Sequence, residues 1–287
     1  MEPTDQDIEQ FIASVNKFSH YDFRDYSNKS LQRRLAKILS DYDLDITRLI
    51  ERMQRESSFL EQVVKEITVS TTELFRDPEV WQALRWRILP RLKDRDPVKV
   101  WSVGCSTGLE VYSFMIIAYE TGIGESVELI GTDLNTQTLQ QAKQGIYSYR
   151  FNQNYLRNFD KVMRENPVNP EQSFHVPYTK YFHIDPVKDT LRAREFLTRR
   201  VTFRKYDLVT GVAPDPLPFD LILCRNVIIY FNYHLQNKVF KLFYDRLQSG
   251  GYLLLGQHES ILGTGQMKFI RDGFFYRKPE QEPDHPY

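Results

Sequence analysis

The stretch Lys99-Val-Trp-Ser-Val-Gly-Cys-Ser-Thr-Gly-Leu-Glu-Val-Tyr-Ser113 decides the fold. Its first residues are typical of a β-strand, residues 104–108 are small, and a helical segment follows. A strand, a tight loop and a helix in this order direct backbone N–H groups at a ligand. Gly104 and Gly108 allow tight backbone angles and close approach of a ligand. The pattern predicts a β–α turn that holds a cofactor, and an ordinary connecting turn is the alternative.

An acidic residue ends the next predicted strand, Leu129-Ile-Gly-Thr-Asp133, about 25 residues after the loop. In doubly wound folds an acid at this place binds ribose hydroxyls, both in dinucleotide enzymes and in S-adenosylmethionine enzymes. The loop does not have the Gly-x-Gly-x-x-Gly spacing of a dinucleotide site. Glu110, at the start of the helix, would repel a pyrophosphate but can accept hydrogen bonds from an α-ammonium group. The combination favours S-adenosylmethionine.

A third signal is Phe219-Asp-Leu-Ile-Leu-Cys-Arg-Asn-Val-Ile-Ile-Tyr-Phe231, a buried strand whose end becomes polar. Ligands of open α/β sheets bind at the carboxyl ends of the strands. Arg225, Asn226 and Tyr230 are therefore candidate site residues. The alternative is a polar strand end that is capped by solvent.

The surrounding pattern predicts an α/β fold with a largely parallel sheet, because short β-rich runs alternate with helical segments. A helix is expected at 79–91. From Gly145 to Arg200 the alternation breaks down, and this segment is too long for a simple connection, so we expect an inserted element. A lid, a partner-binding subdomain and a poorly ordered loop are the alternatives, and the aromatic content disfavours disorder. The expected strands are 98–103, 127–133, 201–206, 219–224 and 252–255, the expected helices are 110–119, 136–144 and 235–247, and 267–271 with 273–277 resembles a hairpin.

The first part of the chain has a different pattern. From Asp7 to about residue 66 it has no glycine, and apolar residues recur at helical spacing. This predicts a small helical bundle. Its basic run Gln32-Arg-Arg-Leu-Ala-Lys37 is either a solvated helix face or a docking surface for an acidic partner.

Composition excludes several classes of function. The 38 basic and 38 acidic side chains balance, so no overall field attracts nucleic acid or a membrane surface. Cys105 and Cys224 form no Cys-x-x-Cys pair, which argues against a disulfide framework and a metal site. No window approaches about 18 consecutive apolar residues. We expect no nucleic-acid partner, no metal, no membrane insertion and a cytoplasmic location.

Together these segments resemble the CheR family, S-adenosylmethionine-dependent methyltransferases that esterify glutamates of bacterial chemoreceptors. The likeness covers nearly the whole chain and is carried by Leu31-Gln-Arg-Arg-Leu35, Thr68-Val-Ser-Thr-Thr-Glu-Leu-Phe-Arg-Asp-Pro78, the loop Gly104–Gly108 with Glu110, Tyr112 and Ser113, and Cys224-Arg-Asn-Val-Ile-Ile-Tyr-Phe231. It implies an all-α N-terminal domain with a linker at 1–77. A class I, Rossmann-like methyltransferase domain would follow at 78–287, with a small inserted β-subdomain at 147–200.

The resemblance also implies roles for individual residues. Glu110 would bind the amino-acid part of the cofactor, Asp133 its ribose, and Asp207 and Leu208 would line the adenine side. Tyr230 and Arg76 would orient the reacting groups, since an ionised glutamate is already a nucleophile and needs positioning and desolvation more than a base. The remaining cofactor contacts would be Ser70, Thr72, Arg76, Gly104, Arg225 and Asn226.

The implied reaction uses S-adenosylmethionine, releases S-adenosylhomocysteine and serves chemotaxis or a related signalling system. Its partner would be the cytoplasmic helix bundle of a chemoreceptor, and the enzyme would be a monomer. Ser70 and Leu109 depart from the family pattern and leave open an inactive, cofactor-binding regulatory protein. A methyltransferase for a small molecule or nucleic acid is a third possibility, which the zero net charge disfavours.

Overall fold

The computed structural model describes residues 2–68, 71–209, 218–261 and 267–280. The chain divides into two units. Met1–Ser70 and Val227–Phe240 form the first, called here the helical unit, and Thr71–Asn226 and Lys241–Tyr287 form the second, the sheet unit. The sequence placed residues 227–240 with the second domain, whereas the structure groups them with the N-terminal helices.

Four helices build most of the helical unit. Thr4 starts the first helix with a capping box, since its side chain accepts from the backbone of Asp7 and the Asp7 side chain accepts from the backbone of Thr4. The residues that share one face of each helix are buried together, as the sequence periodicity predicts. These helices are α1 (Asp5–Phe18), α2 (Asn28–Tyr42), α3 (Ile46–Arg55) and α4 (Ser57–Thr68).

Backbone hydrogen bonds attach segment 227–240 to this unit. Ser27 N–H donates to the carbonyl of Tyr230 at 2.8 Å, and Asn232 N–H donates to the carbonyl of Asp25 at 2.9 Å. The segment contains the short 3₁₀ helix Ile228–Tyr230 and the first turns of α11 (Tyr233–Arg246). Tyr230 therefore belongs to the helical unit.

A seven-stranded sheet forms the centre of the sheet unit, in the order β6-β2-β1-β7-β8-β10-β9. The first five strands run parallel, and β10 and β9 continue as an antiparallel hairpin. The order reverses at β1, and open α/β sheets bind their ligands beyond the carboxyl ends of the strands at such a reversal. The strands are β1 (Val98–Val103), β2 (Val127–Asp133), β6 (Val201–Lys205), β7 (Phe219–Cys224), β8 (Leu247–Leu255), β9 (Ile270–Asp272) and β10 (Phe275–Arg277).

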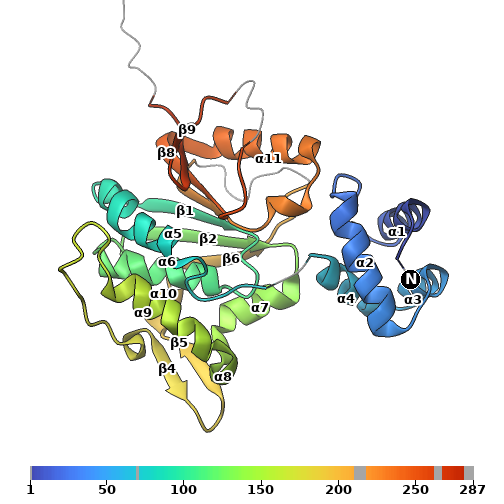
Figure 1. Ribbon diagram of the computed structural model, residues 1–287, viewed down its shortest axis with the longest axis horizontal. Coiled ribbons are helices and arrows are strands. Elements are labelled where there is room, and N and C mark those ends of the chain that lie inside the picture. The colour runs from blue at the N-terminus through green and yellow to red at the C-terminus, as the bar shows by residue number, and fades with distance from the viewer. Residues whose placement is uncertain (1, 69–70, 210–217, 262–266, 281–287) are drawn as a thin grey trace, which may run out of the picture. The chain divides into compact units, whose positions relative to one another are not determined.

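Both faces of the sheet are covered. Val100 of β1 belongs to the large core cluster that includes the buried face of α6 (Leu109–Glu120). The next residue, Trp101, points the other way and packs edge-on against Phe243 of α11. The helix α7 (Thr136–Gln144) packs against β2 and β6 (Figure 1). The predicted α/β architecture is confirmed.

A three-stranded antiparallel sheet interrupts the doubly wound pattern, in the order β3-β5-β4. It is the inserted β-subdomain that the family resemblance predicted. Its strands are β3 (Ile146–Ser148), β4 (Phe182–Asp185) and β5 (Thr190–Ala193), and the helices of this segment are α8 (Tyr149–Asn152), α9 (Leu156–Arg164) and α10 (Glu195–Thr198), with 3₁₀ turns at Gln153–Tyr155 and Tyr178–Lys180.

The helix expected at 79–91 is divided. It begins as α5 (Pro78–Ala83), continues as a π-helix at Leu84–Ile88 and ends as a 3₁₀ turn at Leu89–Leu92. Pro90 cannot donate the next α-helical hydrogen bond, so a regular helix cannot continue through it. Within the described ranges, no helix combines the length and apolar character needed to cross a membrane.

Candidate cofactor site

The turn between β1 and α6 is held in a tight conformation. Gly104, Ser106 and Gly108 all have positive φ, at 65°, 51° and 87°. A Cβ atom at position 108 would lie 2.9 Å from Cβ of Ala142, so glycine is needed there for space as well as for its backbone angles. The Tyr147 hydroxyl donates to the carbonyl of Thr107 at 2.6 Å, which ties the loop to β3. The loop is therefore fixed from the inserted sheet as well as from its own helix.

Asp133 lies at the carboxyl end of β2 and holds the same turn. Its Oδ2 accepts from Ser106 N–H at 2.8 Å, and its Oδ1 accepts from Asn135 N–H at 2.9 Å. Burial raises the pKa of Asp133, and the backbone hydrogen bonds oppose this shift. The side chain remains partly exposed, so it can also accept hydrogen bonds from a ligand.

Glu110, in the first turn of α6, is a buried carboxylate. Ser102 Oγ of β1 donates to its Oε1 at 2.9 Å, and Arg225 Nη1 lies 3.6 Å from its Oε2. Burial raises the pKa of Glu110, while Arg225 and the hydrogen bond from Ser102 lower it. The structure thus brings Glu110 and Arg225 together, as the sequence predicted from the ends of neighbouring strands.

Arg225 is the centre of a larger network. Its side chain is 1% exposed and its Nη2 donates to Oδ2 of Asp77 at 2.8 Å. The same nitrogen donates to the main-chain carbonyl of Arg76 at 2.8 Å, and the guanidinium lies 5.3 Å from the ring centroid of Trp81. The linker residues that follow position 70 therefore reach the sheet edge through their backbone and through Asp77.

The other strand ends complete the same edge. Asn226 follows Arg225 with φ of 58°, and its N–H donates to Glu259 Oε2 at 2.8 Å. Asp207 and Leu208 follow β6, which pairs with β2 so that Lys205 is opposite Asp133. Leu208 is buried, and Asp207 Oδ1 accepts from Val209 N–H at 2.9 Å. The arrangement gathers polar and apolar groups beyond β6, β2, β1 and β7.

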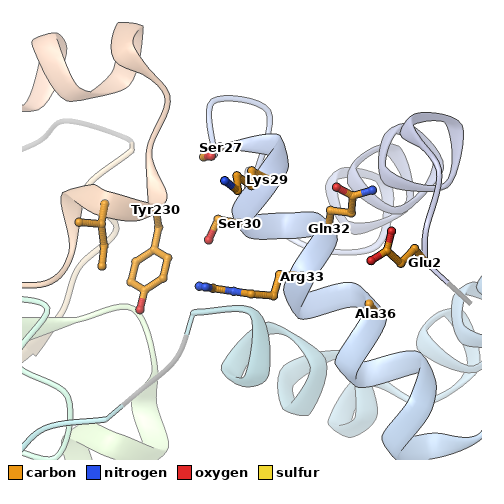
Figure 2. Close-up of a pocket in the computed structure, with 9 residues that line it drawn as sticks. Glu2, Ser27, Lys29, Ser30, Gln32, Arg33, Ala36 and Tyr230 are labelled. Atoms are coloured by element: carbon orange, nitrogen blue, oxygen red, sulfur yellow. The ribbon is translucent and has the colours of Figure 1, made fainter.

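The structure does not place three of the predicted residues, Ser70, Thr72 and Tyr230, among the side chains described at this sheet edge. Ser70 lies outside the described residues. Thr72 lies in a segment without regular secondary structure that precedes Phe75, and Tyr230 belongs to the helical unit. Tyr230 lines a pocket of about 450 Å³ in that unit, together with Lys29 and Arg33 of α2. Figure 2 shows the Arg33 side chain extending from α2 toward Tyr230.

Sequence reasoning missed Asp77, Ser106, Tyr147 and Glu259. Asp77 stands in the quoted linker, and its positive φ of 57° could not be read from the sequence. Glu259 follows an unassigned Gly-Gln-His segment after the last parallel strand. Its position after the carboxyl end of a strand was a usable signal, because ligand-facing residues gather there.

The residues present fit the predicted S-adenosylmethionine. In the part of the chain that the structure describes, Ser106 Oγ is buried in the cofactor loop with no hydrogen-bond partner. Glu110 supplies a buried acceptor suited to an ammonium group, and Asp133 supplies a partly exposed acceptor suited to ribose hydroxyls. Ser106 and Glu110 follow β1 and Asp133 ends β2, and these two strands pair in parallel.

Comparisons with known proteins show the family of the chain and its cofactor. The family description "CheR methyltransferase, SAM binding domain" matches residues 70–272. The Cher3 protein of Pseudomonas putida is 34% identical over 259 residues, which cover 90% of each chain. A chemotaxis protein methyltransferase of Listeria monocytogenes is 26% identical over 278 residues, 96% of this chain and 98% of that protein. Chemotaxis protein methyltransferase 1 of Pseudomonas aeruginosa is 29% identical over 272 residues, 88% of this chain and 90% of its own. The chain therefore belongs to the CheR family of methyltransferases, and its cofactor is S-adenosylmethionine.

Proposed function

We propose that this methyltransferase esterifies glutamate side chains on the cytoplasmic helix bundle of a chemoreceptor. The observation that carries the proposal is the pocket of the helical unit, where Lys29 and Arg33 lie beside Tyr230. Glu2 also lines the pocket, so its two cations outnumber its one carboxylate, and together with the phenol they suit an acidic side chain presented by a protein. The names of the Listeria and Pseudomonas aeruginosa relatives, both chemotaxis protein methyltransferases, support the same assignment.

The proposed reaction needs no general acid or base from the enzyme. A glutamate with a pKa of about 4.3 is ionised at neutral pH. S-adenosylmethionine would supply an electrophilic methyl group on a sulfonium sulfur. A carboxylate oxygen forms the new C–O bond as the C–S bond breaks, the sulfur keeps that electron pair, and no proton moves. Rate enhancement then comes from positioning and from removal of water around the carboxylate.

The residues of the sheet edge would hold the cofactor. We propose that Glu110 accepts hydrogen bonds from its ammonium group and that Asp133 accepts them from its ribose. Asp207 and Leu208 would line the adenine, with Arg225 and Asn226 beside the amino-acid part. Ser70, Thr72, Arg76 and Gly104 would supply further contacts, as the family resemblance implies.

The roles of Arg76 and Tyr230 and the cellular location complete the proposal. Arg76 and Tyr230 would orient the acceptor carboxylate and the methyl group without transferring a proton. Because the proposed substrate is the cytoplasmic part of a receptor, we propose that the enzyme acts in the cytoplasm. Methyl transfer to the acceptor is what separates this proposal from a regulatory protein that only binds the cofactor.

Methylation of purified receptor cytoplasmic fragments tests the proposal. The assay uses S-adenosylmethionine labelled in the methyl group and measures the label released by mild base, because methyl esters hydrolyse under conditions that leave N-methyl groups intact. We expect base-labile label on glutamate-containing peptides. We expect Arg33→Glu to reduce the rate by about tenfold, since it reverses a cation of the pocket.

Arg55→Glu is the matched control, because Arg55 is an exposed arginine of α3 that does not line the pocket. It should leave the rate within about twofold of the wild type. Label that survives base treatment would contradict ester formation. Equal effects of the two charge reversals would contradict a role for the pocket in docking the acceptor.

A further inference from the structure

One carboxylate oxygen joins the ends of two neighbouring strands at the cofactor edge. Glu259 is 8% exposed, and its Oε2 accepts from Asn226 N–H at 2.8 Å and from Gly256 N–H at 2.7 Å. Asn226 lies just beyond β7 and Gly256 just beyond β8, two strands that pair in parallel up to Cys224 and Leu255. A single side chain thus fixes the geometry of both strand ends.

The fit between this carboxylate and the backbone is close. A Cβ atom at Gly256 would lie 2.6 Å from Glu259 Oε2 and 3.0 Å from the backbone nitrogen of Asn226. A side chain at position 256 would therefore displace the carboxylate from the two N–H groups. The space around Gly256 is filled by this interaction.

The residue that Glu259 holds is in an unfavourable backbone conformation. Asn226 has φ of 58°, in the left-handed region that residues other than glycine adopt only when their surroundings hold them there. The N–H that donates to Glu259 belongs to the peptide group joining Arg225 to Asn226, so this bond fixes the orientation of that group. Arg225 on its other side is 1% exposed and bonded to Asp77 and to the carbonyl of Arg76. A shift of the peptide group would move Arg225 out of this network.

We propose that Glu259 is a positioning residue for the cofactor site. It holds the Arg225–Asn226 turn in the orientation in which these two residues contact S-adenosylmethionine, and it does so by the reach of its side chain rather than by its charge. The inference rests on the assignment of Arg225 and Asn226 to the cofactor, and it does not depend on the methyl acceptor.

Titration calorimetry of the full chain with S-adenosylmethionine and with S-adenosylhomocysteine tests the proposal. Glu259→Ala removes both hydrogen bonds and should weaken binding of both ligands by about tenfold or more. Glu259→Asp keeps the charge but is one methylene too short to reach both N–H groups, so it should weaken binding similarly. Glu259→Gln can place its carbonyl oxygen where Oε2 lies and should stay within about threefold of the wild type.

Asp220→Ala is the matched control. Asp220 is 4% exposed, accepts from Lys99 N–H at 2.8 Å and pairs with Arg95, but it lies at the opposite end of β7. This variant should melt at a lower temperature and keep the wild-type affinity. If Glu259→Ala lowers the melting temperature as Asp220→Ala does and leaves both affinities unchanged, the residue is only structural and the proposal is wrong.

The aspartate and glutamine variants keep the test decisive if the alanine variant does not fold. Tighter binding by the glutamine variant than by the aspartate variant supports positioning by reach. The opposite order would show that the negative charge itself is what the site uses, and it would overturn the proposal. The titration contains no methyl acceptor, so its outcome is independent of whether the enzyme methylates glutamate.

Discussion

Replacing Arg225 with methionine removes the cation that joins three parts of the sheet edge. Arg225 Nη2 lies 2.8 Å from Asp77 Oδ2, and Nη1 lies 3.6 Å from Glu110 Oε2. Methionine is unbranched and of similar length to the aliphatic part of arginine, so it fills most of the same space, but it removes the guanidinium that lies over the ring of Trp81. The substitution leaves the carboxylates of Asp77 and Glu110, which are 24% and 11% exposed, without their guanidinium partner.

The cost follows from this burial. Removing one partner of a buried ion pair typically costs about 3–5 kcal/mol, because the remaining charge stays buried without compensation. Glu110 is largely buried and Asp77 less so, which favours the lower end, about 3 kcal/mol. For a domain of this size the expected fall in melting temperature is roughly 6–12 °C.

Urea unfolding followed by tryptophan fluorescence measures this change. All three tryptophans, Trp81, Trp86 and Trp101, lie in the sheet unit, so the signal reports the unfolding of that unit. The free-energy deficit of Arg225→Met should narrow when Glu110→Gln is added, because the second substitution removes the uncompensated charge. If the two substitutions add independently, or if Arg225→Met alone leaves the free energy of unfolding unchanged, the ion network does not stabilise the fold as argued.

The pH dependence provides a further check on the same variant. Burial already raises the pKa of Glu110 above its ordinary value of 4.5, and Arg225 is the largest influence that lowers it. Without Arg225 the pKa rises further, so the native state binds a proton that the unfolded state releases. Stability of the variant relative to the wild type should therefore increase as the pH falls from neutral through the raised pKa toward 4.5. If the free energy of unfolding of Arg225→Met falls further below that of the wild type at lower pH, Glu110 is not the group left uncompensated.

Three more substitutions test other parts of the site. Gly108→Ala should lower the free energy of unfolding by about 1–3 kcal/mol in urea, because its Cβ would lie 2.9 Å from that of Ala142 and φ is 87°. Tyr147→Phe removes the donor to the Thr107 carbonyl and should weaken S-adenosylmethionine binding by about threefold in calorimetry, with a stability loss of about 1 kcal/mol. The affinity of the wild type for S-adenosylmethionine should fall as the pH is lowered through the raised pKa of Glu110. Glu110→Gln should bind the cofactor more weakly and lose this part of the pH dependence. If the pH profile of binding is the same in the variant and the wild type, the carboxylate of Glu110 does not take part in binding.

The sequence predicted those site residues whose position follows from the direction in which the strands run. Carboxyl ends of parallel strands meet at one edge, so Glu110, Asp133 and Arg225 could be placed together from the order of strands and helices. The break in the alternation between Gly145 and Arg200 located an inserted element, and the family resemblance alone predicted that it is a β-subdomain. These predictions needed no knowledge of side-chain contacts.

Other features depend on contacts between distant segments, which local patterns do not reveal. Arg225 and Asp77 are 148 positions apart, and nothing in either segment identifies the other as its partner. Residues 227–240 follow a strand of the sheet unit directly, and they nevertheless pack with the N-terminal helices through the backbone bonds to Asp25 and Ser27. The sequence order indicated that this segment belongs to the sheet unit, whereas its packing assigns it to the helical unit.

Left-handed backbone angles recur at the cofactor edge. Asp77, Ser106 and Asn226 account for three of the six non-glycine residues with positive φ among the described residues. Such residues cost about 1–3 kcal/mol each and persist where the surroundings hold them. Glycine would relieve the strain, but at Asp77 it would also remove the carboxylate that pairs with Arg225.

Ser106 differs from Asp77 in this respect. Its hydroxyl is buried without a partner in the described part of the chain, and its bond to Asp133 uses only the backbone N–H. Ser106→Gly should therefore raise the free energy of unfolding by about 1 kcal/mol in urea, since it removes both a strained backbone and an unsatisfied hydroxyl. The same variant should bind S-adenosylmethionine several-fold more weakly in calorimetry, because it removes a hydroxyl that we expect to form a hydrogen bond with the cofactor. A variant that is more stable and binds as tightly as the wild type would show that the cofactor does not use this hydroxyl.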